Sequence, residues 1–295
     1  MTTLDKCPSC GATAFSDWLI CRDHTVSKNE FTIVGCNNCQ LKFTNPRPKE
    51  TEIGAYYESE EYISHTNQGQ GLFDKIYRQV RQWAVNSKLE LMTSLKPQKG
   101  HLLDIGCGTG FFVSQAKANG WRVSATEPGQ KPREEASQAT QIDVAETIFE
   151  LEQQGRGGAY DVITMWHVLE HVHQLNETIA WIKQHLKPEG KLIVAVPNHQ
   201  SYDAQIFKEH WAAYDVPRHL YHFSADSMTQ LMAQHDLKIE TIKPMKFDAF
   251  YVSLLSTKYK FGQTKPINAF WNGLLSNLKA GQNSYSSLIY VISKN

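Results

Sequence analysis

Apolar runs alternate with amphipathic stretches through the middle of the chain, from about residue 49 to residue 245. Short apolar runs that predict buried strands lie at 101–105, 121–126, 160–166 and 191–196. Patterns with the spacing of helices lie at 72–95, 111–119 and 168–186, and Gly120 is placed to end the second of them. Strands that alternate with helices in this way are typical of an α/β fold with a mostly parallel sheet.

The two ends of the chain follow other patterns. Residues 1–48 contain two cysteine pairs and end in the proline-rich segment 45–48. After Pro266, the apolar residues that share one helical face are Ile267, Phe270, Trp271, Leu274, Leu275 and Leu278. We expect this face to pack on the core. The alternatives are a lid over a bound molecule or a helix on a membrane surface, because lysines surround the face.

These patterns divide the chain into four parts. We expect a small metal-binding module at 1–48, a helical linker and lid at 49–95, the α/β core at 96–245, and a C-terminal helical insertion with a final strand at 246–295. The apolar run at 287–292 predicts that final strand, antiparallel to its neighbours and at the edge of the sheet.

The charge balance narrows the class of partner. Thirty basic residues match thirty acidic ones, so the net charge is zero at pH 7. A protein that binds a long phosphate backbone needs clustered lysine and arginine, and the balance therefore disfavours nucleic acid. The first residues lack the apolar run of a signal peptide, and no segment approaches the length of a membrane span. We expect a cytoplasmic protein; its oligomeric state stays open.

A glycine-rich turn follows the strand predicted at 101–105, with Gly106, Gly108 and Gly110 at alternate positions. Glycine tolerates unusual backbone dihedral angles and has no Cβ, so a ligand can lie against this backbone. The spacing differs from the Gly-x-Gly-x-x-Gly pattern of dinucleotide sites, and the Gly-Lys-Ser/Thr pattern of a P-loop is absent. The alternative is an ordinary connection between a strand and a helix.

Two carboxylates are placed to complete a ligand site at this turn. Asp104 precedes Gly106 by two positions and can reach an amine of the ligand. Glu127 ends the next predicted strand, seventeen residues after Gly110, and can accept hydrogen bonds from both hydroxyls of a ribose. An amino acid joined to a nucleoside without phosphates fits these features.

The segment from Asp104 to Gly110 resembles motif I of the class I methyltransferases, and Glu127 matches their ribose-binding acid. Segments 160–171 and 186–192 resemble their fourth strand with the helix after it and the turn into their fifth strand. This resemblance implies a Rossmann-like sheet and an S-adenosylmethionine-dependent enzyme. The residues expected to bind the cofactor are Asp104, Gly106, Cys107, Gly108, Gly110, Glu127, Met165, Trp166 and His167, the last three because ligands gather at the carboxyl ends of parallel strands.

A general base is needed only if the methyl acceptor loses a proton, as a hydroxyl or a carbon acid would. Histidine has a suitable pKa, and the candidates near the carboxyl ends of the strands are His167, His199, His219 and His222. We favour His167 and His219. The alternative for each is a structural role, and Ser224 is placed to cap the helix that follows.

The segment from His167 to His171 also matches the His-x-x-Glu-His pattern of a class of zinc proteases. Two histidines four residues apart can share a helix face and bind zinc. This alternative function is a zinc metallohydrolase through His167 and His171. Its weakness is that no clear third ligand follows in the sequence.

The cysteine pairs Cys7/Cys10 and Cys36/Cys39 resemble the two knuckles of a zinc ribbon. Tetrahedral zinc takes four thiolates, and Cys-x-x-Cys lets one tight turn supply two of them. A redox pair is the alternative. A site with four thiolates has no open position, so we expect structural zinc.

The acceptor is less constrained than the cofactor. The run at 211–224 resembles that of relatives associated with glycan and small-molecule tailoring, so we expect a small-molecule or glycan-precursor acceptor, methylated at oxygen or carbon. The alternative is an RNA methyltransferase that uses the zinc ribbon to recognise RNA. Six basic and five acidic residues in the first fifty disfavour this alternative.

Overall fold

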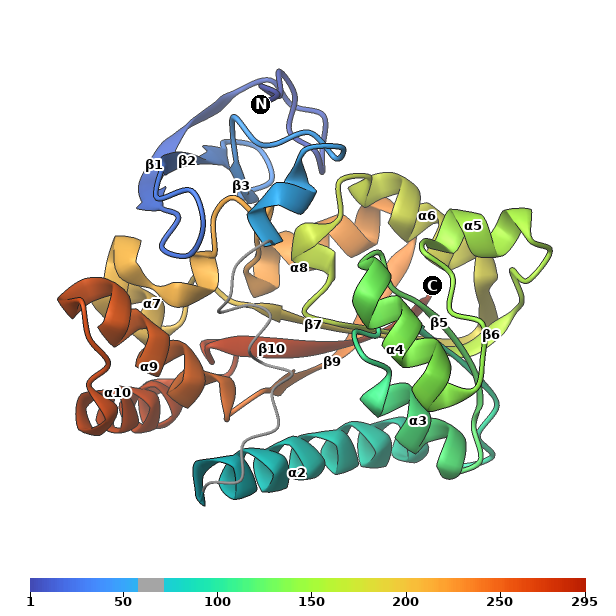
Figure 1. The fold of residues 1–295 in the computed structure, drawn as a ribbon. Coiled ribbons are helices and arrows are strands. Elements are labelled where there is room, and N and C mark those ends of the chain that lie inside the picture. The colour runs from blue at the N-terminus through green and yellow to red at the C-terminus, as the bar shows by residue number, and fades with distance from the viewer. Residues whose placement is uncertain (58–71) are drawn as a thin grey trace.

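A six-stranded sheet forms the centre of the computed structural model, which describes residues 1–57 and 72–295 (Figure 1). Its strand order is β5-β4-β6-β7-β10-β9. The strands are β4 (His101–Ile105), β5 (Arg122–Thr126), β6 (Tyr160–Trp166), β7 (Leu186–Pro197), β9 (Leu237–Pro244) and β10 (Ser287–Lys294). The first four are mutually parallel, and β10 is antiparallel to both of its neighbours. The Rossmann-like fold expected from the sequence is confirmed.

Successive residues of the central strands face opposite layers of helices. Leu103 and Ile163 pack in one cluster with α6 (Leu175–His185) and α8 (Ala225–Gln234). Leu102 and Val162 pack in another cluster with α2 (Leu72–Leu95) and α3 (Phe111–Ala118). Figure 1 shows α2 on one side of the sheet and α6 and α8 on the other. Because both faces are covered, these strands are apolar at nearly every position, as the sequence pattern required.

The remaining helical segments are short or lie at the periphery. The α-helices are α4 (Gln130–Thr140), α5 (Ile148–Gln153), α7 (Tyr202–Phe207), α9 (Asp248–Phe261) and α10 (Pro266–Lys279). The 3₁₀ turns are η1 (Ile53–Tyr57), η3 (Leu169–His171), η4 (Lys208–His210) and η5 (Ala212–Tyr214). Part of the linker and lid expected at 49–95 falls on residues 58–71, which lie outside the described residues.

Two sequence-based boundaries differ from the structure. The helix expected from residue 168 begins only at Leu175, because η3 precedes it and the carbonyl of Glu170 accepts a hydrogen bond from the distant Leu220 N–H (2.7 Å). The final strand is antiparallel as expected, but it does not lie at the sheet edge. The strand β9, which the pattern did not indicate, pairs with β10 and forms that edge.

The N-terminal module shares its sheet with the core. Strands β1 (Phe15–Arg22), β2 (Glu30–Cys36) and β3 (Lys42–Thr44) form an antiparallel sheet whose fourth strand, β8 (Tyr221–His222), comes from the core. Buried Thr44 donates from Oγ1 to the His219 carbonyl (2.8 Å) and lies 3.2 Å from Nε2 of His222. The module therefore holds the segment that carries His219.

The C-terminal insertion is a hairpin of α9 and α10 between β9 and β10. The expectation that the large apolar face of α10 packs on the core was wrong. Ile267, Phe270 and Trp271 are 74%, 54% and 56% exposed. Small residues on the opposite face, Ala269 and Gly273, are the buried ones, because they allow close contact between the two helices.

None of the helices in the described ranges has the length and apolar character needed to cross a bilayer.

We expect Thr44→Val to destabilise the protein by about 1–3 kcal/mol, because it leaves the buried His219 carbonyl and His222 ring without their hydroxyl partner. Urea unfolding measures the change. The matched control is Thr241→Val on the exposed face of β9, which should change the free energy of unfolding little. Equal changes in the free energy of unfolding for the two substitutions would contradict a stabilising role for the Thr44 hydrogen bonds between module and core.

Candidate active site

The glycine turn after β4 leaves one position open to a ligand. Gly106, Gly108 and Gly110 all have left-handed φ values, +72°, +55° and +76°. A Cβ on Gly106 would lie 2.5 Å from Cγ2 of Val168, and one on Gly110 would lie 2.9 Å from the Cα of Ala136. These two glycines thus allow neighbouring segments to approach. A Cβ on Gly108 would meet nothing within 4 Å, so this backbone faces open space.

Glu127 lies against this turn, as the sequence predicted. Its Oε2 accepts a hydrogen bond from Gly108 N (2.9 Å), and its Oε1 accepts one from Gly129 N (2.9 Å). Burial raises the pKa of this carboxyl, although both hydrogen bonds oppose the rise. Each carboxylate oxygen has two lone pairs, so each oxygen can still accept a hydrogen bond from a ligand hydroxyl.

Asp104 is buried beside the turn at the end of β4. Burial raises its pKa to about 7, although the hydroxyl of Thr164, which donates to Oδ1 (2.5 Å), and the charge of Lys88 both lower it. A buried carboxylate with so few partners is stabilised by a cation that arrives with a ligand. A ligand amine is such a cation.

Lys88 is a residue of this site that the sequence pattern did not reveal. It extends from α2, and its Nζ lies 4.4 Å from the centre of the Trp166 ring. Its charge acts on Asp104 and Asp248, and burial lowers its pKa. The buried Nε1 of Trp166 has no partner among the described residues. A lysine within a predicted helix is expected to face solvent. Only the folded structure therefore shows that Lys88 lies at this site.

The other residues expected to bind the cofactor differ in how far their side chains are exposed. Cys107 and Trp166 are half-buried at the carboxyl edge of the sheet. The Met165 side chain is fully buried in the core between neighbouring strands, so only its backbone can face a ligand. The role of each residue in cofactor binding stays a prediction.

His167 follows β6 in a left-handed conformation (φ 58°) and lies between two carboxylates. Its Nε2 is 3.0 Å from Oδ2 of Asp248, and its Nδ1 is 3.4 Å from Oε1 of Glu170. Burial opposes the charged ring, but the two acids prevail and raise its pKa to about 10. His167 is therefore a cation near neutral pH in this arrangement, and a cationic imidazole cannot accept a proton.

His219 has a different environment. Its Nδ1 lies 2.8 Å from the Ala213 carbonyl, which can only accept, so Nδ1 carries a proton and donates it to this carbonyl. Its ring lies edge-on to His171, with 4.6 Å between ring centres. Asp215 lies 4.0 Å from Nε2 and forms an ion pair with Arg218. The structure thus places His219 in a buried polar cluster, with its Nδ1 held by a backbone carbonyl.

The two other candidate histidines belong to the contact between module and core. His199 is half-buried against Trp18 of β1, with 5.2 Å between ring centres, and desolvation lowers its pKa to about 4. His222 is buried beside Thr44, and burial lowers its pKa well below the ordinary value. The capping role expected of Ser224 is present, since its hydroxyl accepts from Ser227 N at the start of α8.

The geometry does not support the metallohydrolase alternative. His167 lies outside the 3₁₀ turn that contains His171, so the two rings do not share a face of one helix. The atoms that come together within 4.8 Å belong to Glu170, His171 and His219 instead. That set could hold a divalent cation, but His167 is engaged with Asp248 and is not part of it.

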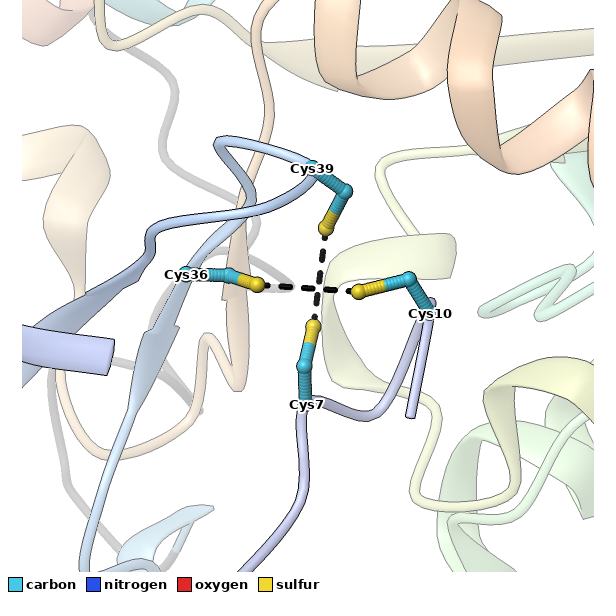
Figure 2. Close-up of side chains that lie close together, drawn as sticks. All are labelled: Cys7, Cys10, Cys36 and Cys39. Carbon is cyan, nitrogen blue, oxygen red and sulfur yellow. Dashed lines mark hydrogen bonds between the residues drawn. The ribbon is translucent and has the colours of Figure 1, made fainter. Parts of the chain in front are cut away.

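Four cysteine sulfurs converge in the N-terminal module (Figure 2). The Sγ atoms of Cys7 and Cys39 are 3.6 Å apart, as are those of Cys10 and Cys36. A disulfide would need about 2.05 Å. Sulfurs bound about 2.3 Å from a tetrahedral zinc ion lie roughly 3.8 Å from one another, so the spacing fits a shared metal.

Comparisons with known proteins agree with this geometry. The family described as "Methyltransferase domain" matches residues 76–242. The chain is 25% identical over 161 residues to a ubiquinone biosynthesis O-methyltransferase of Rickettsia felis, a match that covers 51% of this chain and 65% of the relative. The match thus spans slightly less than two thirds of that relative's length.

Solved structures show the same fold. The magnesium protoporphyrin IX methyltransferase of Synechocystis, with bound SAH, has a TM-score of 0.55 at 14% identity, over 84% of this chain and 100% of that one. The geranyl diphosphate C-methyltransferase of Streptomyces coelicolor has a TM-score of 0.51 at 14% identity, over 79% of this chain and 88% of that one. At such identities the likeness concerns the fold alone.

We expect Asp104→Asn to stabilise the protein at alkaline pH. A folded-state pKa of about 7, above the ordinary 3.8, gives stability that is fully present below pH 3.8 and lost as the pH rises through 7. Asparagine keeps an oxygen acceptor for Thr164 and carries no charge. The melting temperature of the variant should therefore exceed that of the wild type at about pH 8, and the gain should shrink at about pH 5.

The control for this experiment is Asp17→Asn on the exposed face of β1, which should show no such pH dependence. A gain from Asp104→Asn that is the same at both pH values would contradict the raised pKa.

Proposed function

This chain belongs to the methyltransferase domain family, and we propose that it transfers the methyl group of S-adenosylmethionine to an oxygen or carbon of a small-molecule or glycan-precursor acceptor. The observation that carries the proposal is the carboxylate of Glu127 bonded to the open backbone of Gly108. This pair lies at the carboxyl ends of parallel strands, where ligands of such sheets bind.

The residues at the turn fit this cofactor. Glu127 would accept hydrogen bonds from the ribose hydroxyls, and Asp104 would face the amine of the methionine part. The cofactor supplies an electrophilic methyl group on a sulfonium sulfur. The chain's task is to hold the acceptor in line with that methyl group and to exclude water.

A small acceptor agrees with the relatives and with the charge of the chain. The relative from Rickettsia felis is a ubiquinone biosynthesis O-methyltransferase, and the chain carries no excess of basic residues. No feature described above supports RNA as the acceptor. Whether the acceptor is a free small molecule or a glycan precursor depends on the acceptor side of the site.

We assign the role of general base to His219 in this proposal. An acceptor hydroxyl must lose a proton during transfer, and Nε2 of His219 would take it while Nδ1 stays hydrogen-bonded to the Ala213 carbonyl. His167 is already protonated near neutral pH, so its part would be to hold positive charge between Asp248 and Glu170 at the acceptor edge.

Zinc on the four cysteines is the second part of the proposal. Cys7, Cys10, Cys36 and Cys39 would hold the ion, which would act as a crosslink, because four thiolates leave no position for a substrate. Three of these cysteines lie in the same apolar cluster as the central sheet. The zinc would therefore stabilise the contact that holds β8 and His219 in place.

We expect Glu127→Ala to weaken binding of S-adenosylmethionine by about one to two orders of magnitude, because it removes the acceptor of charge-assisted hydrogen bonds. Isothermal titration calorimetry measures the change, and Glu127→Gln serves as a second variant if the alanine variant does not fold.

The control Glu134→Ala, on the exposed side of α4, should bind like the wild type. His219→Asn should also bind like the wild type, since its role concerns the acceptor. Wild-type protein that binds no S-adenosylmethionine would refute the proposed function.

We expect the purified protein to contain one zinc ion per chain, held by the four cysteines. The double variant Cys7→Ser/Cys36→Ser should lose the metal and melt at a lower temperature, since structural zinc contributes directly to folding. Elemental analysis by mass spectrometry measures the content. Cys21→Ser, which changes a buried thiol outside the set, should keep the zinc. Zinc that survives the double variant would exclude these ligands.

A further inference from the structure

Helix α10 turns its large apolar side chains away from the protein. Ile267, Phe270, Trp271 and Leu278 are 54–74% exposed, and at about 100° per residue they fall on one face. The opposite face carries the buried Ala269, Gly273 and Ser276. A surface helix of a globular protein normally shows the reverse arrangement. We call the exposed face, Ile267, Phe270, Trp271, Leu275 and Leu278, the apolar patch.

The orientation of α10 is fixed by contacts that only small residues allow. A Cβ on Gly273 would lie 2.9 Å from the Cα of Phe250, so the two helices touch closely at this point. Ser276 donates from Oγ to Oδ1 of buried Asp203 (2.7 Å). Asp203 also accepts hydrogen bonds from Trp211 and Ser286 (both 2.7 Å). The helix cannot roll to bury the patch without breaking this buried network.

The charged side chains of the segment that contains the patch are all positive from residue 249 onward. From residue 249 to residue 295 the chain contains five lysines and no Asp or Glu. The whole chain is neutral, so the rest of it has a net charge of −5. None of the ion pairs within the described residues involves Lys260, Lys265 or Lys279. Four of the five, Lys258, Lys260, Lys265 and Lys279, lie on the hairpin, whose acid, Asp248, contacts His167.

We propose that the α9–α10 hairpin binds the surface of an anionic lipid bilayer, with the apolar patch inserted among the headgroups. Tryptophan, phenylalanine and leucine on one face of a helix, with lysines beside them, are the features of helices that lie in a membrane interface. The Nζ of Lys265 lies over the ring of Phe261, 4.0 Å from its centre. Such a lysine can place its charge on lipid phosphates while its stem covers apolar surface.

A second copy of the chain is a poorer occupant of the patch. In a twofold symmetric dimer the same patch lies on both partners. Its lysines would then face lysines, because the acid of the hairpin, Asp248, contacts His167 and the segment from residue 249 onward contains no Asp or Glu. Like charges across an interface oppose association, whereas anionic lipids attract them.

The hairpin also leads to the acceptor edge of the candidate active site. At the start of α9, Asp248 contacts His167, and the preceding Phe247 packs on Trp83 of α2 with 4.4 Å between ring centres. Phe247 and Trp83 are both about half exposed. A bound bilayer would therefore lie near the side from which an acceptor enters. This last step rests on the proposed function.

Vesicle flotation of the full chain, without cofactor, tests the proposal. We expect the protein to float with vesicles of equimolar phosphatidylcholine and phosphatidylglycerol, and to float little with pure phosphatidylcholine. The double variant Trp271→Gln/Leu278→Gln should bind at least about tenfold less, and so should Lys265→Glu/Lys279→Glu. The matched controls are Ile20→Gln, an exposed isoleucine on β1, and Lys238→Glu, an exposed lysine at the start of β9. Both should bind like the wild type.

A spectroscopic measurement locates the contact. Brominated phosphatidylglycerol in the vesicles should quench part of the tryptophan fluorescence, and Trp271→Phe should lose most of that quenching while it still floats. Wild-type protein that does not float with anionic vesicles, or patch variants that float as well as wild type, would overturn the proposal. Patch variants that turn a dimer into a monomer in size-exclusion chromatography would assign the patch to a second copy instead. Calorimetry with S-adenosylmethionine tests the proposed function separately, because the patch variants leave the glycine turn unchanged.

Discussion

A single carboxylate joins the two turns on which the candidate cofactor site depends. Glu127 accepts one hydrogen bond from Gly108 N and one from Gly129 N, and so it holds the turn after β4 beside the turn after β5. The arrangement requires Gly106 and Gly110 to allow close approach of neighbouring segments while Gly108 leaves its own backbone open. A shape made of backbone N–H groups and buried acids suits a ligand that offers hydroxyls and an amine, and this is the basis for assigning a nucleoside-linked amino acid.

The acceptor side depends on a second constraint, the shared sheet of the N-terminal module and the core. Pairing of β3 with β8 fixes the backbone on either side of His219 and His222, and Thr44 binds to both residues. Three of the four clustered cysteines lie in the same apolar cluster as β3, β8 and the central strands. The module is therefore packed as part of the core and not as an independent attachment, although its composition alone suggested a boundary near residue 48.

Features that depend on a local pattern of residues could be predicted from the sequence. The strands from β4 to β7, the glycine turn and Glu127 were predictable, because buried parallel strands are apolar throughout and the spacing of the turn is distinctive. Lys88 and Asp248 were not, because their place beside Asp104 and His167 arises from contacts across more than a dozen residues of sequence. The packing of α10 was predicted wrongly because large apolar residues suggest a buried face. Here Ala269 and Gly273 pack instead, since they permit the close approach of α9.

The central claim is that Glu127 and the open backbone of Gly108 bind the nucleoside of S-adenosylmethionine. The most direct measurement is a crystal structure of the protein with S-adenosylhomocysteine. We expect both ribose hydroxyls within hydrogen-bond distance of the Glu127 carboxylate and the amine of the homocysteine part near Asp104. A ligand whose ribose lies away from Glu127, or a turn that the protein's own side chains fill, would contradict it.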